Sequence, residues 1–210
     1  MDPKRLVADG YDRIADRYAQ WTQHVRDDAR EHYTSLLLQE VAPGARVLEL
    51  GCGAGIPTTR GLAARFKVTG VDISARHIAL AQQHVPEADF VCADMTALSF
   101  PPASFAAVAA FYSIIHVPRH EHGLLFKEIA RWLQPEGLLV ATMGAGDLPG
   151  SVEPNWLGAP MYWSHYDSAT NKQLVAQAGL EIVSAREETA EEDGEPVTFL
   201  WIVARKPAEG

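Results

Sequence analysis

A glutamate followed by three alternate glycines, in the stretch VLELGCGAG, is the first place where residue types and spacing suggest chemistry. The apolar run around Glu49 predicts a buried strand. The residues Gly51, Gly53 and Gly55 predict a tight turn whose backbone can approach a ligand closely. The dinucleotide fingerprint does not fit, because Ile56 stands where its last glycine is required. The carboxylate would also repel a pyrophosphate, so the stretch favours a nucleoside with a positively charged or zwitterionic tail.

Two further acids follow the next two predicted strands. Asp72 ends the stretch VTGVD, where a carboxylate can accept hydrogen bonds from ribose hydroxyls. Asp94 ends the stretch FVCAD, where a carboxylate can accept from an adenine amino group. Because parallel strands end at the same edge of a sheet, we expect these two acids and Glu49 to meet at one nucleoside site.

The order of elements predicts an α/β fold, a Rossmann-like doubly wound sheet that is mostly parallel. Apolar runs predict strands at 47–50, 68–73, 90–93, 106–112 and 138–143, and helical periodicity or caps predict helices at 56–66, 75–85, 122–133 and 168–178. Two last strands, 180–187 and 197–204, predict an antiparallel C-terminal hairpin with the acidic run 187–195 as its solvated turn. Residues 144–166, rich in glycine, proline and aromatics, predict a long loop. We expect one domain over 1–210, with a helical cap at 1–40 and the Rossmann-like core at 41–210.

Composition narrows the class of protein. The formal net charge of −9 and the lack of a Lys/Arg cluster argue against a nucleic-acid partner. No apolar run is long enough to span a membrane, and no export signal is recognisable at the N-terminus. Cys52 and Cys92 lie in apolar, strand-like stretches, which favours core thiols and a reduced, cytoplasmic setting. A small-molecule partner is therefore expected.

Together these motifs resemble the class I S-adenosylmethionine-dependent methyltransferases, from about residue 41 to 204. The acid followed by G-x-G-x-G, the two strand-end acids and the segments FYSIIHVP and LQPEGLLVATM carry the resemblance. It implies S-adenosylmethionine as cofactor, with Met95 offering a backbone N–H to adenine. It also implies that the N-terminal helices close over the cofactor. The expected cofactor-binding residues are Glu49, Gly51, Gly53, Gly55, Asp72, Ile73, Asp94, Met95, Tyr18 and Tyr11.

An acceptor pocket is expected between the N-terminal helices, the end of the fourth strand and the aromatic segment 155–167. His116 is a candidate general base for an O–H or N–H nucleophile, with a locally hydrogen-bonded histidine as the alternative. His116, His120 and His122 do not predict a metal site, because Pro118 interrupts them and no acid or cysteine completes a ligand set. The expected substrate-pocket residues are Tyr112, His116, Trp156, Met161, Trp163 and His165.

The sequence thus predicts methyl transfer from S-adenosylmethionine to a small-molecule acceptor by in-line displacement. The nucleophilic atom, O, N, S or C, stays open, as do the need for a general base and the choice between monomer and homodimer. One alternative is a module that binds S-adenosylmethionine without catalysis. Another is a nicotinamide-dependent oxidoreductase, against which Ile56 and the three acids count.

Overall fold

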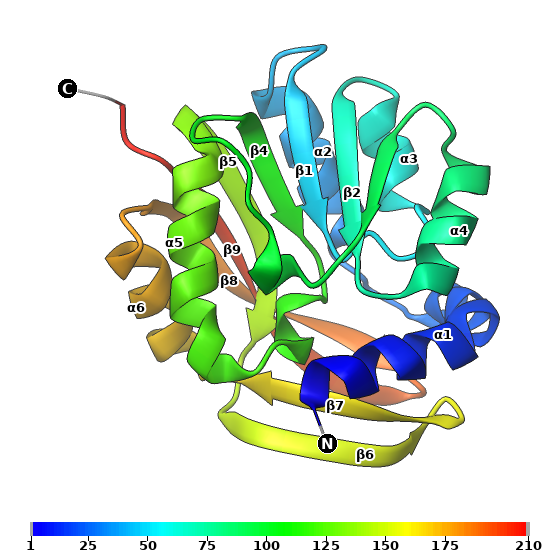
Figure 1. The fold of residues 1–210 in the computed structure, drawn as a ribbon. Helices are drawn as coiled ribbons and strands as arrows, with labels where there is room; N and C mark the ends of the chain where they lie inside the picture. The colour runs from blue at the N-terminus through cyan, green and yellow to red at the C-terminus, as the bar shows by residue number, and fades with distance from the viewer. Residues whose placement is uncertain (1, 209–210) are drawn as a thin grey trace.

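The computed structural model describes residues 2–208 and is built around a seven-stranded sheet (Figure 1). The strands β1 to β5 are parallel, and β9 runs antiparallel between β5 and β8. The expected fold class is therefore confirmed. In spatial order the strands are β3 (Asp89–Cys92), β2 (Lys67–Asp72), β1 (Arg46–Leu50), β4 (Phe105–Ala110), β5 (Leu133–Gly144), β9 (Glu195–Arg205) and β8 (Glu181–Glu192).

Helices cover both faces of this sheet, as a doubly wound fold requires. On one face α2 (Arg30–Glu40) and α3 (Thr58–Ala63) share a core cluster with Val47. On the other face α5 (His122–Trp132) and α6 (Ser168–Gln177) share a cluster with Leu48 and Leu50. Successive side chains of a strand point to opposite faces, so Glu49 is directed to the α2 and α3 side. The helix α4 (Ala75–His84) follows β2 and is capped by the Ser74 hydroxyl, as expected.

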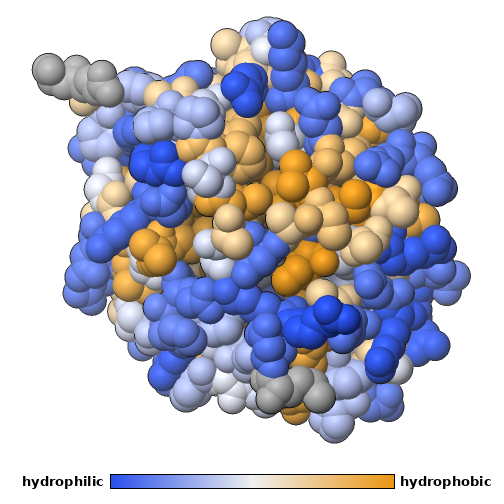
Figure 2. All heavy atoms as spheres, viewed as in Figure 1, coloured by the Kyte–Doolittle hydropathy of each residue, from blue (hydrophilic) through white to orange (hydrophobic). Residues whose placement is uncertain are grey.

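The connection from β3 to β4 contains no α-helix, only the 3-10 turn η2 (Met95–Ala97). The edge strand β3 is consequently poorly covered, and Val91 remains 37% exposed. Leu124 on α5 is also exposed, at 64%. Figure 2 shows apolar side chains gathered in the middle of this view, with polar residues around them.

The segment 144–166 is not a long loop, so this prediction is wrong. Two antiparallel strands, β6 (Leu148–Trp156) and β7 (Ala159–His165), form a separate two-stranded sheet. Gly158, with a φ of 95°, makes the tight connection between them. Met161 on β7 packs with Ile14 of the first helix in a small core of its own.

The first helix, α1 (Pro3–Trp21), lies across the carboxyl ends of the parallel strands, with β6 and β7 on its other side (Figure 1). Asp12 fixes it to α4 by accepting from the Ser74 hydroxyl at 2.6 Å and from the Arg76 N–H at 3.0 Å. Of the predicted cap segment 1–40, α1 lies over the strand ends, whereas α2 packs on a face of the sheet with α3 (Figure 1). No helix among residues 2–208 has the length and apolar character needed to cross a membrane.

The acidic run 187–195 is not a solvated turn, because β8 and β9 continue through it. The pairing of Glu192 with Glu195 leaves only Asp193 and Gly194 as the turn. The hairpin end also contacts the N-terminal segment: the Trp21 indole N–H donates to Asp193 at 3.0 Å. Glu192 therefore lines a cavity together with Tyr18 and Trp21 of α1.

Candidate functional site

The three glycines of the first loop have three different roles in the structure, although all have positive φ. A Cβ on Gly51 would lie 2.2 Å from the Cβ of Ser113, so this position has no room for a side chain. A Cβ on Gly53 would meet nothing within 4 Å, because this residue faces an open cavity. A Cβ on Gly55 would meet Ala81 at 3.2 Å. Gly55 therefore packs against α4 and lines neither of the cavities beside the loop.

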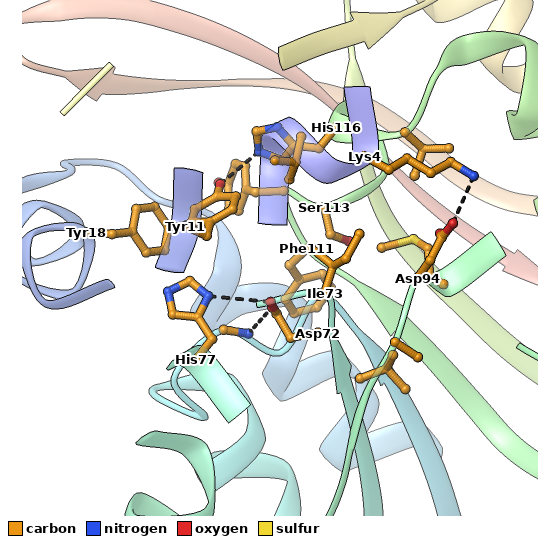
Figure 3. A pocket seen from close by; sticks show the side chains of 18 residues that line it. Lys4, Tyr11, Tyr18, Asp72, Ile73, His77, Asp94, Phe111, Ser113 and His116 are labelled. Atoms are coloured by element: carbon orange, nitrogen blue, oxygen red, sulfur yellow. Dashed lines mark hydrogen bonds and ion pairs between the residues drawn. The ribbon is translucent and has the colours of Figure 1, made fainter. Parts of the chain in front are cut away.

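Two cavities flank this loop. The acid-strand cleft contains Asp72, Ile73, Asp94 and Met95 at the ends of β2 and β3, with Tyr11 closing it from α1 (Figure 3). The glycine-loop cavity, of about 600 Å³, lies on the other side and contains Glu49, Arg30 and Thr58. Both are lined by Tyr18, Gly51 and Gly53. The structure thus brings nine of the ten expected cofactor residues to one continuous region, and Gly55 is the exception.

Asp72 is 8% exposed at the end of β2 and is oriented by backbone amides. Its Oδ2 accepts from the Gly53 N–H at 2.9 Å, and its Oδ1 accepts from the Ser74 N–H at 2.9 Å. The ring of His77 lies 3.5 Å from Oδ1 (Figure 3). The carboxylate therefore connects the glycine loop to the start of α4 and retains lone pairs toward the cleft.

Asp94, at the end of β3, is paired with Lys4 of α1. The ammonium group lies 2.9 Å from Oδ2 and also donates to Thr96 and Glu121. Burial by itself would raise the pKa of Asp94, but the bonds from Lys4 and Thr96 outweigh it and lower the pKa. Asp94 is therefore ionised, and Lys4 is a cleft residue that the sequence analysis did not single out.

Glu49 is 3% exposed on β1 and accepts a hydrogen bond from the Thr59 hydroxyl at 2.6 Å. Burial raises the pKa of Glu49 to about 8, although the Thr59 bond and the Arg30 charge act in the opposite direction. An added positive charge in the cavity would favour the ionised form. The residue is thus suited to receive an ammonium group.

Arg30, the first residue of α2, is the main site residue that the sequence analysis missed. Its Nε is buried without a hydrogen-bond partner and lies 3.4 Å from Asp28. Its guanidinium carbon lies 4.9 Å from the centre of the Tyr112 ring. A buried, incompletely bonded guanidinium beside Glu49 fits a ligand that carries both a carboxylate and an ammonium group. No motif surrounds Arg30, so only the fold reveals its place.

A third cavity, the aromatic cavity, opens between the cap, the end of β4 and the β6–β7 sheet. Four of the six expected substrate-pocket residues line this cavity: Tyr112, His116, Trp156 and Trp163. Met161 does not, because it is completely buried in the small core against α1. His165 does not either: its ring is packed against Gly144 and bonded to the Gly146 carbonyl. Six residues that the sequence analysis did not expect in the acceptor pocket also line this cavity: Tyr18, Trp21, Asp28, Arg30, Glu192 and Phe199.

His116 has a partner on each ring nitrogen. Nδ1 lies 2.8 Å from the Tyr162 carbonyl, which can only accept, so Nδ1 carries the proton. Nε2 then accepts from the Tyr11 hydroxyl at 2.8 Å (Figure 3). Burial lowers the pKa of His116 to about 4, against the effect of the carbonyl bond. The ring is therefore neutral and fixes the Tyr11 hydroxyl at the boundary of two cavities.

Acid is expected to destabilise the fold between about pH 6.5 and pH 4. Burial lowers the pKa of both His116 and His122 to about 4, from the ordinary value of 6.5. Over this range the unfolded chain binds two protons on these histidines that the native chain does not. They outweigh the one proton that native Glu49 retains because its pKa is raised to about 8, so the free energy of unfolding falls as the pH falls. Urea unfolding at several pH values measures the slope. A His116→Asn variant should show a shallower slope, and an unchanged slope would contradict the assignment.

Among residues 2–208, no group of three or more His, Cys, Asp or Glu side chains has the geometry of a metal site. This statement covers His116, His120 and His122.

Comparisons with known proteins agree with this geometry. Residues 47–137 match the family model of a methyltransferase domain. The 27-O-demethylrifamycin SV methyltransferase of Amycolatopsis mediterranei (strain S699) is 33% identical over 154 residues, covering 63% of this chain and 56% of the relative. The 2-methyl-6-phytyl-1,4-hydroquinone methyltransferase of Synechocystis sp. is 28% identical, covering 97% of this chain and 74% of the relative. The chain thus spans little more than half of the first relative's length.

A comparison with a solved structure supports the fold. Magnesium protoporphyrin IX methyltransferase from Synechocystis PCC 6803, with SAH bound, superposes with a TM-score of 0.75 at 17% identity, covering 98% of this chain and all of that one (100%). The sheet order and the glycine loop after β1 define a Rossmann-like fold. Over residues 47–137 the chain is thus similar to methyltransferase domains, and its fold is similar to that of an enzyme solved with SAH bound.

Proposed function

We propose that the protein transfers a methyl group from S-adenosylmethionine to a small-molecule acceptor. The observation that carries this proposal is the placement of the Glu49 carboxyl and the Arg30 guanidinium in one cavity beside Gly53. A methionyl group, with its ammonium and carboxylate, has the charges that these two side chains complement. The adenosine portion then belongs in the acid-strand cleft, on the opposite side of the loop.

Each cofactor residue has a proposed task that follows from its position. Asp72 accepts from the ribose hydroxyls, and Asp94 with the Met95 backbone holds adenine. Ile73 supplies an apolar wall of the same cleft. Tyr11 and Tyr18 cover the site from α1, which makes the cap and the core act as one methyltransferase domain. Gly51 and Gly53 let the backbone approach the cofactor.

The bound sulfonium supplies an activated methyl group, so the chain mainly has to align the acceptor and exclude water. The aromatic cavity does both, because its walls of tryptophan and tyrosine continue into the cleft through Tyr11, Tyr18 and Tyr112. His116 enters this proposal as a positioning residue. The Nε2 atom that would take a proton already accepts from Tyr11.

We also propose a cytoplasmic setting without a nucleic-acid partner, as a monomer or a homodimer. Cys52 and Cys92 both have free thiols, which is usual in a reducing compartment. The net charge of −9 opposes binding to a phosphate backbone.

A calorimetric titration with S-adenosylmethionine, S-adenosylhomocysteine and NADH tests the proposal. Micromolar binding of the first two and no binding of NADH is the expected result, followed by formation of S-adenosylhomocysteine with an acceptor. Binding without turnover of any acceptor would favour the non-catalytic module. Tighter binding of NADH would overturn the cofactor assignment.

Binding of S-adenosylmethionine near pH 7 is expected to release a proton from Glu49. With its pKa raised to about 8 by burial, this carboxyl is mostly protonated at that pH. An ammonium group beside it lowers the pKa and expels the proton. Titrations in two buffers of different ionisation enthalpy measure the number of protons released. Glu49→Gln should remove the buffer dependence, and equal heats for the unmodified protein in both buffers would count against this role.

A further inference from the structure

The walls of the aromatic cavity consist largely of aromatic rings. Trp156, one of its lining residues, has its ring centre 5.6 Å from that of Trp21, 5.2 Å from that of Trp163 and 5.8 Å from that of Tyr18. Tyr112 and Phe199 complete the wall, in an edge-to-face pair at 4.9 Å. A cavity lined by several aromatic rings attracts a cation through the negative faces of the rings.

The charged side chains that line this cavity also favour a cation. Asp28 and Glu192 are the acids that line it, and Arg30 is the only Lys or Arg side chain among the described residues that does so. The Arg30 charge is matched by Asp28 at 3.4 Å, and Asp28 also accepts from the Tyr112 hydroxyl at 2.7 Å. The cavity therefore keeps one negative charge in excess.

Glu192 is the source of this excess. It lies on the same face of β8 as buried Ala190, because alternate residues of a strand share a face. Its carboxylate has no hydrogen-bond or ion-pair partner within residues 2–208, unlike its neighbour Glu191, which lies near Arg26. Burial raises the pKa of Glu192, and the neighbouring Asp193 and Asp28 raise it further against the effect of Arg30. A bound cation would satisfy this carboxylate.

The volume of the cavity and the backbone conformation of Tyr112 both indicate a preformed binding site. The volume open to the centre of a water molecule is about 40 Å³. A single bound water needs roughly 10–15 Å³ of such volume. A head group of a few heavy atoms fits, and a fused ring does not. Tyr112 has a φ of 53°, a conformation that costs energy for a bulky residue and is often kept for function.

We propose that the aromatic cavity receives the methyl acceptor through an aliphatic amine group, with Glu192 as its counter-charge and proton acceptor. This inference rests on the proposed methyltransferase function. An ammonium nitrogen has no lone pair, so it first gives one proton to the Glu192 carboxylate. The neutral nitrogen then forms a bond to the methyl carbon while the bond from that carbon to sulfur breaks. The product is again a cation, and the aromatic rings stabilise it.

Binding of choline and of its neutral carbon isostere, 3,3-dimethylbutan-1-ol, tests the cation preference without requiring turnover. The titrations follow tryptophan fluorescence with S-adenosylhomocysteine present and again without it. Choline is expected to bind at least about tenfold more tightly than the isostere. Equal affinities, no binding of choline, or tighter binding of the anion 3,3-dimethylbutanoate would overturn the proposal.

The matched variants are Glu192→Gln and Glu195→Gln, which remove one charge each from paired positions of the same hairpin. Glu195 is exposed and lines none of the three cavities. Glu192→Gln should weaken choline binding about tenfold and leave the isostere unchanged, and Glu195→Gln should change neither. Equal effects of the two variants would overturn the role of Glu192. Because choline is also titrated without the cofactor product, failure of the protein to bind S-adenosylhomocysteine would be seen separately, as failure of the proposed function.

Turnover gives the final readout. With S-adenosylmethionine present, secondary and tertiary alkylamines are expected to yield S-adenosylhomocysteine faster than alkanols of matched shape. Faster reaction of the alkanols would overturn the amine assignment.

Discussion

An Asp72→Ala variant should lose binding of S-adenosylmethionine and S-adenosylhomocysteine by about 100-fold or more. A charged acceptor of hydrogen bonds is worth about 1.5–3 kcal/mol per bond, and a ribose offers two hydroxyls, so a loss of about 3 kcal/mol or more is expected. The variant also loses the acceptor for the Gly53 and Ser74 N–H groups, which hold the loop in place. Calorimetric titration measures the affinity directly.

The control separates this effect from a general loss of charge. Asp89 begins the neighbouring strand β3 and is exposed, at the opposite end of that strand from the cleft. Asp89→Ala should bind the cofactor as the unmodified protein does. Circular dichroism must show that Asp72→Ala is folded at the temperature of the titration. If folded Asp72→Ala binds within about threefold of the unmodified protein, the ribose assignment is wrong.

The sequence analysis was most successful where one short stretch of chain determines the structure. Glu49, Asp72 and Asp94 lie within two residues of the ends of β1, β2 and β3, and parallel pairing brings these strand ends together without further information. Gly51 and Gly53 follow from the same local pattern. These residues could therefore be placed before the fold was known.

The β6–β7 sheet was missed because its sequence resembles a loop. Pro149 and Pro154 lie within β6, and proline normally argues against a strand. Both are tolerated because β6 is an exposed edge strand, and the register is irregular where they occur. The burial of Met161 follows from this hairpin and could not be inferred without it.

Arg30 and Glu192 were missed for another reason. They lie 162 positions apart and meet only because the β8–β9 hairpin reaches back to the N-terminal cap. Glu192 belongs to a charged run whose usual place is solvent. Only the pairing of β8 with β9 determines which of its acids turns inward. Acceptor residues of this kind depend on tertiary contacts, so the chemistry of the acceptor was beyond the sequence.

Gly51→Ala is expected to be the most destabilising single substitution in the glycine loop, at about 3 kcal/mol. The new Cβ would lie 2.2 Å from the Cβ of Ser113 and 2.9 Å from its Oγ, which donates to the Leu50 carbonyl at 2.7 Å. Overpacking of this kind costs about 1–3 kcal/mol. The φ of 77° adds about 1–2 kcal/mol for a residue with a Cβ. Urea unfolding measures the change.

Gly53→Ala is the matched control, because its Cβ would meet nothing within 4 Å. It should destabilise by about 1 kcal/mol from its positive φ alone, yet weaken S-adenosylmethionine binding because the methyl group enters the shared cavity wall. Ser113→Gly should relieve the clash, so the Gly51→Ala and Ser113→Gly double variant should be more stable than the sum of the single effects by about 1 kcal/mol or more. If Gly51→Ala is no more destabilising than Gly53→Ala, the predicted clash between a Cβ at position 51 and Ser113 is wrong.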